Sequence, residues 1–212
     1  MKLQLALDGT WSKSLEILRS VISYIDIVEV GTPLIYREGI SAVQRLRASY
    51  PETVILADLK VIDAGEGEAT IAFEAGCDMV TVLGVAHDIT VRGAIAAARH
   101  FKKFIVADLI QVPDPVSRAR QLLNMGCDYL CVHTAHDLSK EYSRSIVVVQ
   151  HLLDELPGAP LAVAGGIGPG TISEIAALDP EIVVVGSAIT SAPDPERAAK
   201  MIRRRMEDYA HS

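Results

Sequence analysis

The chain has 212 residues, 50% of them hydrophobic, and a formal net charge of -7 at pH 7. This length is enough for one sizeable core, and the acidic balance argues against a general nucleic-acid-binding protein, which normally presents a basic face. No apolar run approaches the roughly 20 residues of a membrane-spanning helix, and the chain opens on an apolar strand without the layout of a signal peptide. The three cysteines, Cys77, Cys127 and Cys131, have no zinc-type spacing and are expected to be reduced, mostly buried thiols. We therefore expect a cytoplasmic protein that binds neither nucleic acid nor membrane.

Short apolar runs alternate with stretches of helical periodicity along the whole chain. The apolar runs predict strands over residues 3–7, 25–28, 54–57, 79–83, 104–107, 129–132, 161–164 and 182–185. The segments between them predict helices over 11–22, 38–49, 66–75, 88–100, 114–125, 142–156, 171–178 and from 194 onward. Near-continuous apolar strands are typical of a parallel sheet covered on both faces. The sequence thus predicts one α/β domain over residues 1–212, a (β/α)8 TIM barrel, with an open doubly wound sheet as the alternative.

A faint internal repeat favours such a repeating architecture. The segments Ala75-Gly76-Cys77-Asp78-Met79-Val80 and Met125-Gly126-Cys127-Asp128-Tyr129-Leu130 share a Gly-Cys-Asp core. Both are interpreted as the end of a helix, a short turn and the start of a strand.

Polar side chains follow or end most of the predicted strands. They are Asp8, Glu29, Asp58 with Lys60, Thr81, Asp108 and His133. Each has an ordinary explanation on its own: a turn residue, a strand-end cap, a satisfied core histidine or, for Thr81, β-branched strand filling. In a (β/α) barrel, however, the active site lies at the C-terminal ends of the strands. Together these residues predict a catalytic mouth.

The most concentrated charge lies in the stretch from Asp58 to Asp63. Alternation along a strand places Asp58 and Lys60 on one side, and Asp63 follows on a turn, close enough in sequence to join them. Charges so near a core must be paired or bind something, and a structural ion pair is the plain alternative. Lys60 between carboxylates should stay protonated and act as an electrophilic cation. His133 is the natural proton-transfer group near neutral pH.

Two further features indicate a metal and a phosphate group. Glu29 and Asp58 lie on adjacent strands, and hard oxygen ligands with room for water suit Mg²⁺, whereas a single strand-end histidine makes zinc less attractive. Gly165-Gly166 and Gly186-Ser187 follow the last two strands, where barrels often bind phosphate through backbone N–H groups. Tight turns that need glycine are the alternative for both pairs.

At this point the motifs resemble a known family. Asp58-x-Lys60-x-x-Asp63 resembles the signature of the orotidine 5′-monophosphate decarboxylase suprafamily. The surrounding segments are similar to its 3-hexulose-6-phosphate synthase branch. They span residues 29–35, 57–65, 80–84, 108–110, 132–134, 162–167 and 186–190, so the resemblance covers nearly the whole chain.

The resemblance implies a ribulose-phosphate-binding barrel in the ribulose monophosphate pathway of formaldehyde fixation. The implied reaction is a Mg²⁺-dependent aldol condensation of D-ribulose 5-phosphate with formaldehyde, through a 1,2-enediolate, to D-arabino-hex-3-ulose 6-phosphate. The implied roles are metal binding by Glu29 and Asp58, enediolate stabilisation by Lys60, proton abstraction by His133, and substrate contacts by Asp8, Thr81 and Asp108. The resemblance also implies an obligate homodimer in which Asp63 completes the partner's active site.

A close relative, 3-keto-L-gulonate-6-phosphate decarboxylase, typically has Glu at the position of Asp108, Arg at that of His136, and Gly-Arg where this chain has Gly186-Ser187. These three positions favour the synthase. After His133 and Thr134, however, residues 135–141 lack the glycine and the glutamine that are usual in the synthases. The sugar phosphate and the electrophile therefore stay open, and His136 is an extra imidazole at the mouth or an exposed loop residue. The alternatives are a decarboxylase acting on a sugar phosphate and a non-catalytic sugar-phosphate-binding barrel.

Overall fold

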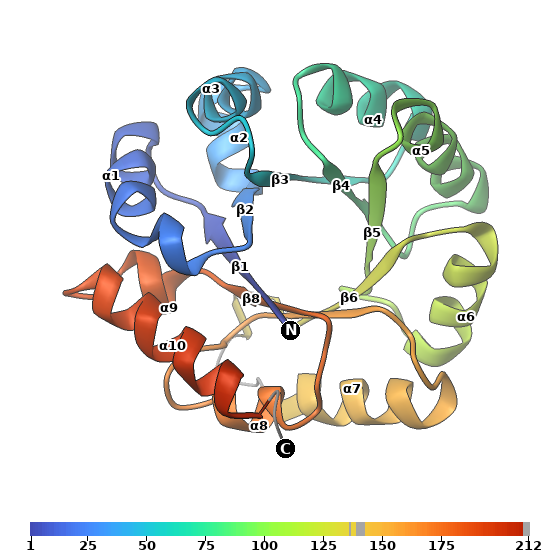
Figure 1. Ribbon diagram of the computed structural model, residues 1–212. Helices are drawn as coiled ribbons and strands as arrows, with labels where there is room; N and C mark the ends of the chain where they lie inside the picture. Colours follow the sequence, from blue (N-terminus) through green and yellow to red (C-terminus); the bar gives the residue numbers. More distant parts are fainter. Residues whose placement is uncertain (136, 139–142, 210–212) are drawn as a thin grey trace.

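The computed structural model describes residues 1–135, 137–138 and 143–209, with side chains 143–145 left aside. Parallel strands, paired in chain order and closed by pairing of the last with the first, form a barrel at the centre (Figure 1). The strands are β1 Lys2–Leu7, β2 Ile27–Val30, β3 Val54–Val61, β4 Met79–Leu83, β5 Phe104–Asp108, β6 Tyr129–His133, β7 Leu161–Ala164 and β8 Ile182–Val185. The prediction of a TIM barrel is confirmed, and the open sheet is excluded.

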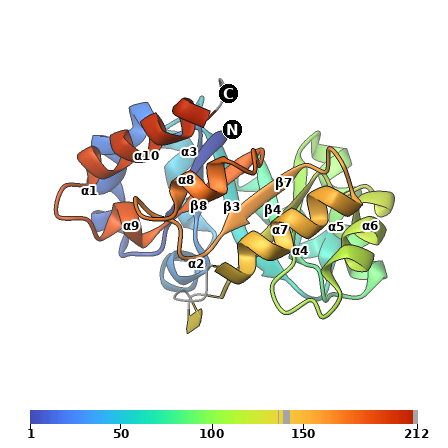
Figure 2. The ribbon, with the colours of Figure 1, turned by 90° about the horizontal axis from the view of Figure 1, so that it is seen from below.

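Helices surround the barrel, and the last one, α10, packs beside α8 and α1 to close the outer ring (Figures 1 and 2). They are α1 Trp11–Val21, α2 Thr32–Glu38, α3 Ser41–Ser49, α4 Gly65–Glu74, α5 Asp88–Phe101, α6 Pro115–Met125, α7 Ser143–Glu155, α8 Ile172–Ala176, α9 Ser187–Thr190 and α10 Pro195–Tyr209, with a 3-10 turn η1 at Ile22–Tyr24. Among the described residues, none of these helices has both the length and the apolar character needed to cross a membrane.

The segment between β2 and β3 differs from the prediction of one helix over 38–49. The structure has two helices there, because α2 ends at Glu38 and Gly39 takes a left-handed φ of 66° before α3 begins. The segment from Thr32 was not predicted to be helical. Pro33 lies in the first turn of α2, where a backbone N–H would have no acceptor within the helix. The short helix α9 after β8 was also not predicted.

Two apolar clusters hold the fold. The larger lies between the strands and the helices, and the smaller fills the inside of the barrel. The inner cluster consists of Ile27, Leu56, Met79, Val106, Cys131, Ala162, Ala164, Ile182 and Val184. The barrel is therefore a packed core with a floor of side chains, not a pore. All three cysteines are free and buried, and burial raises the pKa of the Cys77 and Cys127 thiols to about 12.

The N-terminal face of the barrel carries the same local structure three times. In each, an aspartate lies just before an even-numbered strand and makes two hydrogen bonds with the second residue of the preceding strand. Its carboxylate accepts the N–H of that residue, and its own backbone N–H donates to the carbonyl of the same residue. A guanidinium group from a surrounding helix pairs with the carboxylate. The three sets are Asp26 with Leu3 and Arg203, Asp78 with Ile55 and Arg47, and Asp128 with Ile105 and Arg99. The internal repeat seen in the sequence contains two of these aspartates.

Candidate active site

The polar residues of the mouth lie directly above the inner apolar cluster. Inward-facing positions recur at every second residue of a strand. On five strands the inward position two residues beyond a member of the inner cluster is polar. These members are Ile27, Leu56, Met79, Val106 and Cys131. These next positions are Glu29, Asp58, Thr81, Asp108 and His133 on β2 to β6, whereas on β7 and β8 Ala164 and Val184 keep the inner wall apolar. The fold therefore collects the charged groups on one side of the mouth.

The centre of this polar side is an ion pair between Lys60 and Asp58. Lys60 Nζ donates to Asp58 Oδ2 and lies 3.9 Å from Asp108 Oδ2. Burial by itself would lower the pKa of Lys60, but the charges of Asp58 and Asp108 outweigh it and raise that pKa above its ordinary value. Burial likewise opposes ionisation of Asp58, and the charge of Lys60 holds its pKa below the usual range. Both groups are therefore charged across the physiological pH range.

The predicted contact between Asp58 and Lys60 is present, but it does not result from regular strand alternation. Ala57 pairs with Val80 and Val61 with Val82, so that residues 58–60 of β3 lie opposite Thr81 alone. Within this bulge Lys60 adopts a left-handed φ of 48°. Such a conformation at a non-glycine residue costs on the order of 1–3 kcal/mol and persists only where neighbours fix it.

Hydroxyl groups from two other elements fix Asp58. Thr81 Oγ1 donates to Asp58 Oδ1 at 2.8 Å and accepts the backbone N–H of Lys60 at 2.9 Å. Thr32 Oγ1, in the first turn of α2, lies 2.8 Å from Asp58 Oδ2 and 2.7 Å from the Asp58 carbonyl, and its one proton serves either oxygen. Thr32 was not among the predicted site residues, because its segment was not predicted to be a helix beside the mouth.

Glu29 is a buried carboxyl group beside this pair. Its Oε2 accepts a hydrogen bond of 2.7 Å from Gln4 Nε2, a side chain only 4% exposed. Burial, and then the charge of Asp58, raise the pKa of Glu29 to about 8. Gln4 was also missed, although a polar residue at an inward position of the apolar first strand was a usable signal.

The donor set of Glu29 and Asp58 fits a hard divalent cation. In the part of the chain that the structure describes, no ion pair involves Glu29, and no group of three or more His, Cys, Asp or Glu side chains could hold a metal. Two carboxylates leave most coordination positions to water or substrate, which is the usual arrangement for Mg²⁺ and unlike a structural zinc site. A cation would also favour the ionised form of Glu29, against the burial and the charge of Asp58 that raise its pKa.

His133 lies next to Asp108, at the end of the neighbouring strand. Its Nδ1 is 2.8 Å from Asp108 Oδ2, while Asp108 Oδ1 accepts the N–H of Ile110 at 2.9 Å. A buried carboxylate can only accept a hydrogen bond, so Asp108 holds a proton on Nδ1 and orients the imidazole, which leaves Nε2 as the nitrogen that can act as a base. Asp108 was predicted to contact a sugar hydroxyl, and this contact to His133 was not foreseen. His136 lies outside the described residues.

The remaining predicted residues lie on the rim. Asp8, just after β1, is exposed; its carboxylate packs so closely on Gly31 that a Cβ there would lie 1.9 Å from Asp8 Oδ1. Arg37 Nη1 holds the Asp8 carbonyl at 2.7 Å. Asp63 is exposed, accepts the Ala64 N–H at 2.8 Å and, among the described residues, makes no hydrogen bond or ion pair with Asp58 or Lys60. Within one chain, Asp63 therefore does not join the ion pair of Asp58 and Lys60, although the sequence had suggested this contact.

The glycines predicted to bind phosphate lie on the loops that follow β7 and β8. Gly165 and Gly166 have φ values of 96° and 69°, and a Cβ at Gly165 would lie 2.2 Å from the Thr134 carbonyl oxygen. Gly186 precedes α9, and Ser187 is the exposed first residue of that helix. Gly165 is therefore required by close packing against the loop after β6, and phosphate binding by these four residues stays a prediction.

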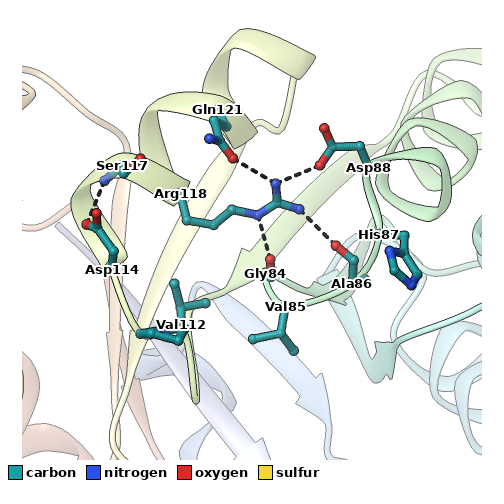
Figure 3. Close-up of a pocket in the computed structure, with 11 residues that line it drawn as sticks. Gly84, Val85, Ala86, His87, Asp88, Val112, Asp114, Ser117, Arg118 and Gln121 are labelled. Carbon is teal, nitrogen blue, oxygen red and sulfur yellow. Dashed lines mark hydrogen bonds and ion pairs between the residues drawn. The ribbon is translucent and has the colours of Figure 1, made fainter.

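A separate hollow of about 750 Å³ lies outside this mouth, between the loop after β4 and helix α6 (Figure 3). Arg118 reaches across it and donates to the carbonyls of Gly84 and Ala86 at 2.7 and 2.9 Å and to Asp88 at 2.6 Å. None of the charged residues of the mouth lines it. Arg118 therefore ties helix α6 to the loop after β4 beside this hollow.

Comparison with known proteins agrees with this geometry. The orotidine 5'-phosphate decarboxylase / HUMPS family matches over residues 1–202. A 3-hexulose-6-phosphate synthase of Bacillus subtilis is 43% identical over 203 residues, covering 95% of this chain and 97% of that protein. The crystal structure of 3-hexulose-6-phosphate synthase from Salmonella typhimurium has a TM-score of 0.95 at 40% identity, covering 99% of this chain and 100% of that one. A 3-keto-L-gulonate-6-phosphate decarboxylase from Vibrio cholerae has a TM-score of 0.86 at 25% identity and 98% coverage of both chains. The chain belongs to the orotidine 5'-phosphate decarboxylase / HUMPS family and is homologous to the 3-hexulose-6-phosphate synthases, which are aldehyde-lyases.

Proposed function

We propose that this protein condenses D-ribulose 5-phosphate with formaldehyde to D-arabino-hex-3-ulose 6-phosphate, with Mg²⁺ as cofactor. The observation that carries the proposal is the presence of two neighbouring pairs on the polar side of the mouth: a charged Lys60 with Asp58, and His133 with Asp108. One pair offers positive charge for a developing anion, and the other offers a base. Full-length similarity to the synthases supports the same assignment.

In the proposed reaction His133 Nε2 removes a proton from C1 of the sugar phosphate. The negative charge moves onto the C2 oxygen, and the ammonium group of Lys60 stabilises the resulting 1,2-enediolate. C1 then attacks the carbon of formaldehyde, a new carbon–carbon bond forms, and the former aldehyde oxygen takes up a proton. His133, protonated in the first step, is the natural donor of that proton.

Glu29 and Asp58 would hold the metal ion. When bound, Mg²⁺ would supply Lewis-acid polarisation of the substrate oxygens. Lys60 restrains Asp58 through the ion pair and Gln4 restrains Glu29 through its amide, so both carboxylates are oriented beforehand. We further propose that Gly165, Gly166, Gly186 and Ser187 bind the phosphate group through backbone N–H groups and the hydroxyl.

We also propose that the active form is a homodimer in which Asp63 enters the partner's site. Asp63 is exposed, and the nearby apolar side chains of Ile62 and Ile89 are 51% and 81% exposed. Ile89 lines one hollow together with Asp63, and exposed apolar side chains that gather on one face mark candidate interaction sites. Subunit complementation tests this proposal. Mixing inactive Asp63→Ala and Lys60→Ala chains by refolding should restore activity at roughly a quarter of the sites if the dimer is two-fold symmetric. No restored activity would remove Asp63 from the partner's site.

The reaction is tested by measuring formaldehyde consumption with D-ribulose 5-phosphate, first with Mg²⁺ and then with EDTA. We expect turnover that EDTA abolishes and that Lys60→Ala lowers strongly. Metal-dependent exchange of the C1 hydrogen with solvent deuterium, without formaldehyde loss, would retain the enediolate and discard formaldehyde as the electrophile. If neither signal appears, release of carbon dioxide from 3-keto-L-gulonate 6-phosphate distinguishes the decarboxylase from a non-catalytic binding protein.

A further inference from the structure

The family resemblance implies that Thr81 contacts the substrate, but its hydroxyl is engaged by two groups of the protein. The residue lies in the middle of β4 and is only 6% exposed. Its hydroxyl has one proton, which goes to Asp58 Oδ1, and it also accepts the N–H of Lys60. The hydroxyl therefore bridges the side chain of one member of the ion pair and the backbone of the other.

The β3 bulge explains why such a bridge is needed. With residues 58–60 opposite one residue of β4, the N–H of Lys60 has no place in the regular ladder of parallel strands. A buried N–H without an acceptor is costly, and Thr81 Oγ1 supplies that acceptor. The same contact holds Lys60 at its left-handed φ of 48°, which turns its side chain back toward Asp58.

We propose that Thr81 is a positioning residue that sets the geometry of Asp58 and Lys60, and that it does not contact the sugar phosphate. The catalytic part of this inference rests on the proposed function, since it takes Lys60 as the group that stabilises the enediolate. The structural part, that Thr81 holds Asp58 and Lys60 in place, does not depend on the proposed function. A hydroxyl group is required at position 81, so serine can replace threonine, while valine, which has the same shape, cannot.

The test compares Thr81→Val, Thr81→Ser and a control, Thr90→Val. Thr90 is a second buried threonine, 7% exposed on α5, and its hydroxyl contacts neither member of the pair. The first readout is hydrogen exchange of the Lys60 amide in metal-free protein. Loss of its acceptor in Thr81→Val should accelerate exchange about tenfold, the size of one net hydrogen bond. Thr81→Ser and Thr90→Val should exchange like the wild type.

The second readout is the division of the kinetic effect between kcat and KM. A misplaced ion pair should lower kcat by about 10²-fold, while KM for the sugar phosphate changes little, and Thr81→Ser should recover most of kcat. A raised KM with unchanged kcat would overturn the proposal and return Thr81 to the substrate. Unchanged exchange at Lys60 in Thr81→Val would overturn it as well.

Failure of the proposed function gives a different result. If wild-type protein does not consume formaldehyde with D-ribulose 5-phosphate, the reaction assignment is wrong, and hydrogen exchange at Lys60 still decides whether Thr81 holds the pair. If Thr81→Val does not fold, Thr81→Ala takes its place, because it removes the hydroxyl without introducing a second methyl group beside Asp58.

Discussion

The protonation of Glu29 should change the stability of the folded protein with pH. The fold raises its pKa from 4.5 to about 8, first by burial and then through the charge of Asp58. Between these two pH values the folded protein keeps a proton that the unfolded chain has lost. The free energy of unfolding should therefore fall as pH rises, by about 1.4 kcal/mol per pH unit at most. Between pH 6 and pH 8 this amounts to about 2 kcal/mol, and above pH 8 the loss should stop.

The other two members of the site do not interfere in this range. Asp58 has a lowered pKa, so its contribution to stability is present above 3.8 and is lost only as pH falls below that value. Lys60 has a raised pKa, so its contribution is complete below 10.5 and is lost only above it. Between pH 5 and pH 9, Glu29 alone of these three groups should change the stability of the metal-free protein.

The assay is urea unfolding with EDTA at several pH values and fixed protein concentration, comparing wild type with Glu29→Gln. The introduced amide oxygen can still accept the hydrogen bond from Gln4, so the variant removes the charge and little else. We expect the variant to gain stability relative to wild type by about 2 kcal/mol from pH 6 to pH 8. A difference that does not vary with pH would refute the assigned cause. With Mg²⁺ added to wild type, apparent affinity should rise toward pH 8, because binding displaces the proton.

Two further predictions concern the rim and the base. Gly31→Ala places a methyl group 1.9 Å from Asp8 Oδ1, so the Asp8 side chain must move. We expect unfolding close to wild type but a higher KM for the sugar phosphate. The matched control is Gly67→Ala, where the added methyl group has nothing within 4 Å, and equal KM values in both variants would contradict the role of Asp8. Asp108→Asn removes the carboxylate that holds the Nδ1 proton of His133, so kcat should fall by about 10²-fold or more. Wild-type kcat in that variant would exclude this orientation of the imidazole.

The architecture could be predicted from the sequence because its signals are local and repeated. Eight apolar runs separated by helical periodicity were sufficient for the barrel, and each observed strand lies within three residues of its predicted range except at β3. There the apolar run ends at Ala57, but the strand continues through the bulge and pairs with β4 again at Val61. The break at Gly39 was not predicted, since a left-handed glycine between two helices has no signature that distinguishes it from an ordinary loop glycine.

The candidate site could be predicted only in part. Strand-end position was enough to collect Glu29, Asp58 and His133, because strand alternation and barrel closure bring such positions together. What holds them could not be predicted in this way. Gln4 and Thr32 act through tertiary contacts with partners 25 and 26 residues away along the chain, and pattern analysis of a single segment does not show such pairs.

The three aspartates on the N-terminal face have a consequence for how this barrel can change. They tie β1 to β2, β3 to β4 and β5 to β6, and these pairs include the four strands, β2, β3, β5 and β6, that carry the charged residues of the mouth. Before β8 the corresponding residue is Glu181, whose carboxylate pairs with Lys2 on β1 instead. Strand register is thus anchored at the end of the molecule farthest from the chemistry. Substitutions in the loops of the opposite end can then alter substrate preference without disturbing the anchors, so new specificities are accessible at little cost in folding.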